Sequence, residues 1–137
     1  MIVNELIARY QQQHLTYALS DIDPGLSGLN LTSSIIWSGA SDQTIYPVPQ
    51  FNWLFRAHHD ALHLAHKMGF TLAEEIELTK RGIAQLHLDT QPDVARLYWL
   101  DNVGQQLHYY RHGQFPVDQQ AFIISAWNDP FYINLLT

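Results

Sequence analysis

Residues 52–86, NWLFRAHHDALHLAHKMGFTLAEEIELTKRGIAQL, decide the fold. At about 100° per residue, the apolar side chains of the first half of this stretch collect on one broad side. They are Leu54, Phe55, Ala57, Ala61, Leu62, Leu64, Ala65 and Met68. The pattern predicts a helix from about Asn52 to Met68, and Gly69 follows where a left-handed residue often ends a helix.

The second half of the stretch predicts another helix. Thr71 and Glu74 have the spacing of a capping box, in which each side chain binds a backbone amide at the helix start. One apolar stripe then continues over 72–86, through Leu72, Ile76, Thr79, Ile83 and Leu86. Because only a few residues join the two helices, we expect them to be antiparallel neighbours.

The flanking sequence also favours helices. Apolar spacing predicts one from Val3 to about Leu19, Thr90-Gln-Pro-Asp93 begins one that runs to about His112, and Phe115-Pro116 begins one that ends near Trp127. We therefore expect a single all-α domain over residues 1–137, a small bundle of about five helices. The predicted core consists of Leu54, Leu62, Ile76, Ile83, Leu97, Leu100 and Leu107.

Residues 20–50 do not fit a helical pattern. Asp23-Pro24-Gly25 and Pro47-Val48-Pro49 are typical of turns, but the segment between them is too apolar for a solvated linker. We expect an ordered loop with one short strand at 34–37. A long loop in a small domain is often functional, so we expect it to lie across the active face.

The composition excludes several classes of protein. The chain has no cysteine, which excludes disulfides, cysteine zinc sites and thiol nucleophiles. Its 7 Lys and Arg stand against 13 Asp and Glu, and its largest basic cluster is Lys80-Arg81, so nucleic acid is not an expected partner. No apolar run is long enough for a membrane helix and the start does not resemble a signal peptide, so we expect a cytoplasmic protein. Only 15% of residues are charged, which favours a surface covered by a protein partner or by self-association.

Histidine is the anomaly, with four of the eight histidines between His58 and His66. His59 and His63 are one helical turn apart, a spacing that lets two imidazoles bind one ion. Glu75 lies at the inner edge of the next helix and is the best third ligand. The pattern predicts one divalent metal ion, zinc or manganese, held by His59, His63 and Glu75.

Other polar residues are candidates for a role around this ion. Asp60, Asp101 and His108 are candidate catalytic groups, acting as a general base or beside the ligands. Asp101 is equally suited to accept a hydrogen bond from the second nitrogen of a liganding histidine. His66 is a weaker ligand candidate, and His58 is expected to be a hydrogen-bonded core residue. The alternative is that Glu75 and the histidines form only a structural network.

Two resemblances bear on function. The order of His14, His59-Asp60 and Asp101 resembles the HD phosphohydrolases, in which a His, a His-Asp pair and a later Asp bind metals on a helical scaffold. Asp60 falls on the outward side of its helix, which departs from that pattern.

The second resemblance rests on FRAHHDALH at 55–63, GFTLAEE at 69–75, Gly104-Gln105 and HGQFPVDQ at 112–119. These motifs resemble small uncharacterised proteins of phages and prophages, over roughly residues 51–122. That family implies a setting in the host cytoplasm but no activity.

Two functions remain open at this point. The first is a phage-type accessory protein that binds a protein partner through an aromatic surface of low charge. The alternative is a small metal-dependent hydrolase that uses His59, His63 and Glu75, with metal-bound water attacking a phosphoester or an amide.

Overall fold

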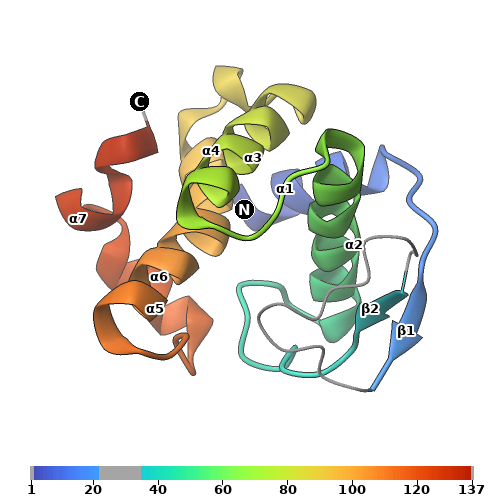
Figure 1. The fold of residues 1–137 in the computed structure, drawn as a ribbon, viewed down its shortest axis with the longest axis horizontal. Coiled ribbons are helices and arrows are strands. Elements are labelled where there is room, and N and C mark those ends of the chain that lie inside the picture. Colours follow the sequence, from blue (N-terminus) through green and yellow to red (C-terminus); the bar gives the residue numbers. More distant parts are fainter. Residues whose placement is uncertain (1, 22–34, 137) are drawn as a thin grey trace.

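The structure is a computed structural model, and it describes residues 2–21 and 35–136 (Figure 1). The elements follow in the order α1 (Ile2–Gln11), β1 (Ala18–Ser20), β2 (Ile35–Trp37), α2 (Pro49–His66), α3 (Leu72–Gln85), η1 (Leu88–Thr90), α4 (Pro92–Trp99), η2 (Leu100–Gly104), α5 (Gln105–His112), α6 (Gln119–Ala126), α7 (Pro130–Ile133) and η3 (Asn134–Leu136). The predicted all-α fold is confirmed.

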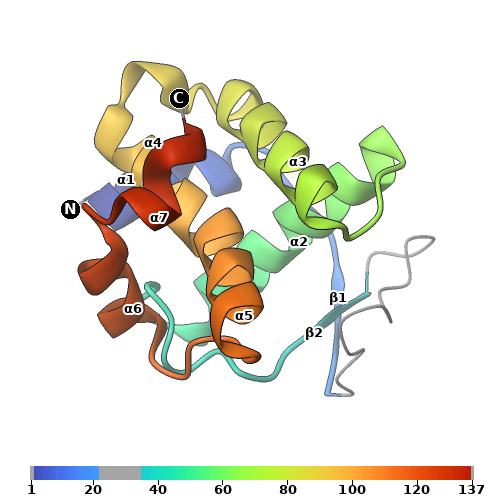
Figure 2. The ribbon, with the colours of Figure 1, turned by 60° about the vertical axis from the view of Figure 1, so that its left-hand side comes forward.

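A continuous helical run through α4, η2 and α5 forms the centre of the molecule. The backbone stays helical at both junctions, but the η2 turn is wider than an α-helix, a π-helical segment. This segment contacts α3, α6 and α7, and its Leu100 and Val103 are fully buried (Figure 2). The long helix predicted over 92–112 is therefore present, with one irregular turn in its middle.

Helices α2 and α3 lie side by side as predicted, and Thr71 and Glu74 form both hydrogen bonds of the capping box. The end of α2 differs from the prediction. Lys67, not Gly69, takes the left-handed conformation, with φ of 52°. The amides of Lys67 and Met68 bind carbonyls of the last turn and close the helix early, while the Gly69 amide donates to Glu74 Oε2 at 2.6 Å.

The first and last predicted helices are too long. Helix α1 ends at Gln11, not near Leu19, because Gln13 and His14 stand where the apolar stripe from Tyr10 would need apolar side chains. The chain then extends into β1, which pairs in parallel with β2, so the expected strand at 34–37 is found at 35–37. Helix α6 begins at Gln119 because the Asp118 carboxylate caps it by accepting from the Ala121 amide at 3.0 Å.

The core is only partly as expected. Leu62, Leu97, Leu100 and Leu107 are buried, whereas Leu54, Ile76 and Ile83 are half-buried and pack against the edge of the core. Aromatic residues of α1 and α4 fill the middle instead, namely Tyr10, Tyr98 and Trp99, all with no exposed surface. Within residues 2–21 and 35–136, none of the helices has both the length and the apolar composition that crossing a membrane requires.

Candidate metal centre

His59, His63 and Glu75 meet between α2 and α3, as the helical spacing predicts. His59 Nε2 lies 3.2 Å from Glu75 Oε2, and His63 Nε2 lies 3.0 Å from Glu75 Oε1. The two Nε2 atoms are 3.0 Å apart. Four ligand atoms arranged tetrahedrally around one zinc ion, each about 2.1 Å from it, lie about 3.4 Å from one another. The three side chains therefore have nearly the separations that a shared ion requires.

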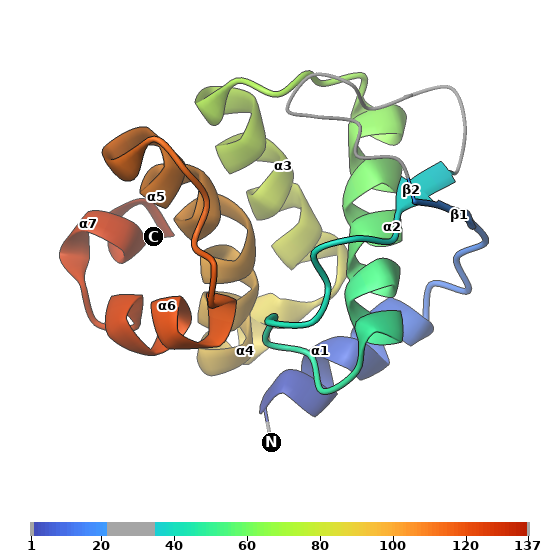
Figure 3. The same cartoon turned by 90° about the horizontal axis from the view of Figure 1, so that it is seen from below.

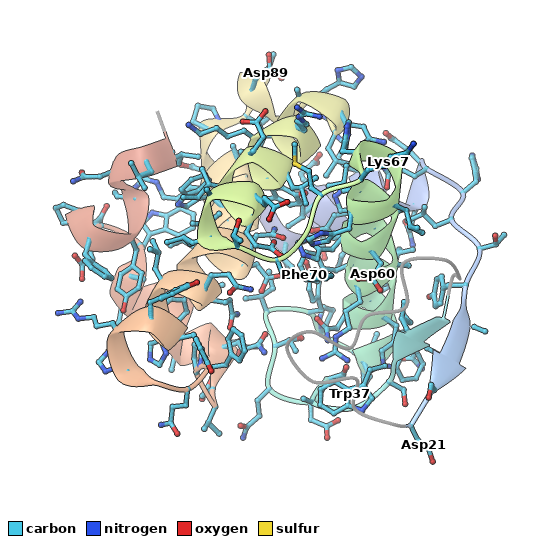
Figure 4. The ribbon with its side chains drawn as sticks, in the orientation of Figure 1. Asp21, Trp37, Asp60, Lys67, Phe70 and Asp89 are labelled. Carbon is cyan, nitrogen blue, oxygen red and sulfur yellow. The ribbon has the colours of Figure 1, made fainter. Side chains whose placement is uncertain are left out.

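The backbone fixes which nitrogen of His63 faces this cluster. His63 Nδ1 lies 3.0 Å from the carbonyl oxygen of Met68, which can only accept, so Nδ1 carries the proton. A neutral His63 then presents the lone pair of Nε2 to His59 and Glu75. Metal-binding histidines commonly have their second nitrogen bound to a carbonyl in this way. The ring is also held by Phe70, whose centroid is 4.5 Å away and which Figure 4 labels in the turn before α3.

The buried carboxylate of Glu75 needs a positive charge beside it. Glu75 is 3% exposed and His63 fully buried. Burial would raise the pKa of Glu75, but the two histidines outweigh it and lower that pKa to about 2. Burial would lower the pKa of His59, but Glu75 raises it overall. A carboxylate facing a lone pair of His63 is satisfied by a proton or by a metal ion in the same position.

The cluster opens on one side into a pocket of about 740 Å³. His59 and Glu75 line this pocket, whereas His63 lies behind them without exposed surface. An ion at the cluster would therefore have protein ligands on the inner side and room for water or substrate on the pocket side. Closed structural zinc sites lack such an open position, and catalytic sites have it.

Asp101, on the π-helical segment η2, lines the same pocket. Its carboxylate accepts from the Tyr46 hydroxyl at 3.0 Å and from Gln105 Nε2 at 3.4 Å. Burial raises the pKa of Asp101 to about 6, in spite of these donors and the nearby His59. A carboxyl group with such a pKa can exchange protons near neutral pH. Asp101 does not fix the tautomer of His63, because the Met68 carbonyl has that role.

The other candidates from the sequence do not belong to the cluster of His59, His63 and Glu75. Asp60 is half-buried on α2 beside His59, and burial raises its pKa (Figure 4). His108 lines a second pocket, where its Nδ1 binds the Gln114 carbonyl and its ring contacts the His112 ring at a tilt of 42°. His66 accepts from Arg81 Nη1 at 2.8 Å.

His58 is the buried core histidine that the sequence predicts. Its Nδ1 binds the side-chain oxygen of Gln13 at 2.8 Å and its Nε2 binds the Tyr98 hydroxyl at 2.7 Å. Burial lowers the pKa of His58 to about 3, so the ring is neutral. The HD pattern is not assembled here, since the metal-ligand group contains neither Asp60 nor the exposed His14.

Part of the expected loop contributes to the pocket. Trp37, Ala40, Asp42 and Gln43 line it, so the described part of the loop does lie beside the cluster. The Arg56 guanidinium stacks 5.0 Å from the Trp37 ring and donates to the Trp37 carbonyl at 2.6 Å, which ties this loop to α2. Figure 3 shows the segment that joins β2 to α2. The predicted loop also spans 22–34, which lies outside the described residues.

Comparison with known protein families, curated proteins and solved structures finds no match. The chemistry of the site therefore has to indicate the function.

Sequence patterns did not reveal the Met68 carbonyl, the donor Tyr46 or the pocket-lining Asn102. Only Asn102 had an available signal, because it directly follows Asp101, which the sequence already marks as a polar candidate.

Proposed function

We propose that the protein is a small metal-dependent hydrolase in which His59, His63 and Glu75 hold one divalent ion, zinc in the first instance. The observation that carries this proposal is the convergence of three ligand atoms within 4.8 Å at the edge of a pocket. The Met68 carbonyl binds Nδ1 of His63, so Nε2 of the same ring faces the other two ligands. Two imidazoles and a carboxylate suit zinc better than magnesium or calcium, which prefer oxygen ligands.

The chemistry follows from the open side of the cluster. A zinc ion held by His59, His63 and Glu75 would lower the pKa of a water molecule toward neutrality and would so supply hydroxide for attack on a substrate in the pocket. Asp101 lines the same pocket and serves as the acid or base that moves the proton to the leaving group. Asp60 lies beside the ligand His59 and tunes the charge around it, whereas His108 has no part in this mechanism.

Zinc binding is the first test. Elemental analysis of the purified protein should find one zinc per chain, and zinc at about one hundred times its Kd should stabilise the fold by about 2.7 kcal/mol. Glu75→Gln preserves the shape of the side chain and should abolish this gain. His63→Ala should abolish it too, with its zinc-free stability measured separately because the ring is buried.

Two other histidines of α2 supply matched controls. His66→Ala removes an imidazole that binds Arg81, so it should retain the zinc-dependent gain in full. His58→Ala removes both core hydrogen bonds, so it should lower stability with or without zinc and leave the gain unchanged. Zinc-dependent release of p-nitrophenol from p-nitrophenyl acetate should require Glu75 and fall in Asp101→Asn, which should still bind zinc. Absence of a stoichiometric metal together with an unchanged melting temperature would contradict the proposal.

A second candidate function has its own observation. Several apolar side chains at the α5 to η3 end of the chain are exposed, namely Tyr110, Val117, Ile124, Phe131 and Leu135. We call this set the C-terminal apolar surface. It favours the binding of a protein partner or of a second copy, the accessory role that the resemblance to phage proteins implies.

A further inference from the structure

Two buried amides of the pocket, Asn102 and Gln105, present their oxygens rather than their N–H groups. Asn102 Nδ2 donates to the Tyr98 carbonyl at 2.7 Å, and Gln105 Nε2 donates to the Asp101 carboxylate. Since both partners are acceptors, they fix the orientation of each amide. Each side chain therefore uses its NH₂ group within the protein, and its oxygen is the group left for another partner.

Asn102 is the sharpest case. Its side chain is 6% exposed and lines the pocket, and Oδ1 is the one fully buried side-chain polar atom without a hydrogen-bond partner in the described part of the chain. An unsatisfied buried acceptor costs free energy, so native structures rarely contain one outside a functional site. Asn102 also lies in the π-helical segment η2, a kind of turn that is frequent at functional sites.

The charges of the pocket point the same way. Asp42, Glu75 and Asp101 are its carboxylic acids, and Arg56 is its cation. The Arg56 guanidinium donates to backbone carbonyls of residues 37–40, so it holds the loop. With a divalent ion bound, its two charges and Arg56 only balance Asp42, Glu75 and Asp101, so the pocket has no surplus positive charge for a doubly charged phosphate group, whereas a group that brings N–H donors meets acceptors.

We propose that the substrate is a carboxamide, a peptide-type bond or a primary amide, whose N–H donates to Asn102 Oδ1. This inference rests on the proposed zinc hydrolase and names its substrate class. Water adds through its oxygen to the carbonyl carbon, the C–N bond breaks, and the water's proton passes to the leaving nitrogen. The products are a carboxylic acid and an amine, or ammonia where the substrate is a primary amide. The apolar residues Trp37, Phe55 and Phe115 line the same pocket and accommodate an apolar substituent of the substrate.

The test compares two zinc-binding probes that differ in one N–H. Benzohydroxamate and N-methylbenzohydroxamate both bind zinc through two oxygens, but only the first has an N–H to donate. Calorimetric titration of the zinc-loaded full chain should give about tenfold tighter binding of benzohydroxamate, because a buried acceptor gains its partner. Phenyl phosphate should bind more weakly than either hydroxamate.

Two variants assign the preference to Asn102. Asn102→Leu has no acceptor and should bind both hydroxamates equally, whereas Asn102→Asp has one and should keep the preference. Gln106→Leu changes a neighbouring residue of the pocket wall and should also keep it. Equal affinities in the unsubstituted protein, or tightest binding of phenyl phosphate, would overturn the inference while zinc binding upholds the hydrolase. Absence of zinc binding would remove the hydrolase itself, and the substrate with it.

Discussion

Folding buries the Asp101 carboxylate, and the free-energy cost of this burial depends on pH. Its pKa in the folded protein is about 6, against 3.8 for an ordinary aspartate, chiefly because of burial. The folded form therefore holds the proton more tightly than the unfolded chain does. The free energy of unfolding must fall as pH rises from about 4 to about 6, and it stays lowered above pH 6.

Asp101→Asn removes this titration and keeps an oxygen that can accept from Tyr46. Relative to the unsubstituted protein, the variant should gain on the order of 2 kcal/mol of unfolding free energy between pH 4 and pH 7.5. Urea unfolding at several pH values, with a chelator present, measures the difference. Asp89→Asn, at an exposed position that Figure 4 labels, is the control and should show no such trend. A stability difference that is equal at both pH values would contradict the assignment.

Single residues also show how far sequence patterns reach into the site. His59, His63 and Glu75 follow from helical geometry, because a separation of one turn and a short connection bring side chains together whatever the remaining packing is. The Met68 carbonyl can bind His63 only because α2 ends at His66. Lys67 then takes the left-handed conformation, two residues before the expected Gly69. The partners of Asp101 depend on how distant segments pack. Tyr46 comes from a loop far away in sequence, which no local periodicity places.

At the scale of elements, Gly82 sets the distance between α3 and α4. A Cβ atom at this position would overlap the Tyr98 hydroxyl and lie 3.1 Å from Leu62 Cδ1. That hydroxyl is bound to His58 Nε2, so it cannot move away without breaking a buried hydrogen bond. The bare glycine therefore allows the close contact of α3 with α4.

Gly82→Ala should lower the free energy of unfolding by about 1 to 3 kcal/mol, because the added methyl group overpacks the contact. The sign is the test, since the same change at an exposed helical position raises stability by up to about 1 kcal/mol. Ala84→Gly, at an exposed position of the same helix, measures the propensity effect alone and should lose about that amount. A stabilised Gly82→Ala would show that α3 and α4 do not pack this closely.

Element boundaries were harder to predict than the elements themselves. The capping box of α3 and the glycine after α5 are local signals, and both act as expected, with Gly113 at φ of 77°. The parallel β1–β2 pair depends on residues far apart in the sequence, since Ala18 pairs with Ile35 and Ser20 with Trp37. Because β1 holds only three residues, its pattern is too short to distinguish from a loop.

At the scale of the whole molecule, low charge and exposed apolar side chains coincide. Charged residues make up 15% of the chain, and Val117 and Ile124 each expose 79% of their surface. Val117 precedes α6, and Ile124, Phe131 and Leu135 belong to α6, α7 and η3. Figure 1 shows α6 and α7 together at one end of the molecule. Apolar side chains that are this exposed gain free energy when another surface removes them from water.

We predict that a second copy of the chain covers the C-terminal apolar surface. Sedimentation at rising concentration should show a dimer forming by high micromolar concentrations, in the range of weak interfaces. Ile124→Glu should weaken this association at least tenfold, because the variant would bury an unpaired carboxylate in an apolar interface, and the free energy that this costs exceeds what burial of the apolar Ile124 side chain contributes. Leu64→Glu is the control, since Leu64 is also exposed but lies on α2, and it should leave the association unchanged. If the chain stays monomeric throughout this range, a second copy does not cover the surface, and a different protein becomes the expected partner of these exposed apolar side chains. Zinc binding should be equal in both variants, since neither residue belongs to the His59, His63 and Glu75 cluster.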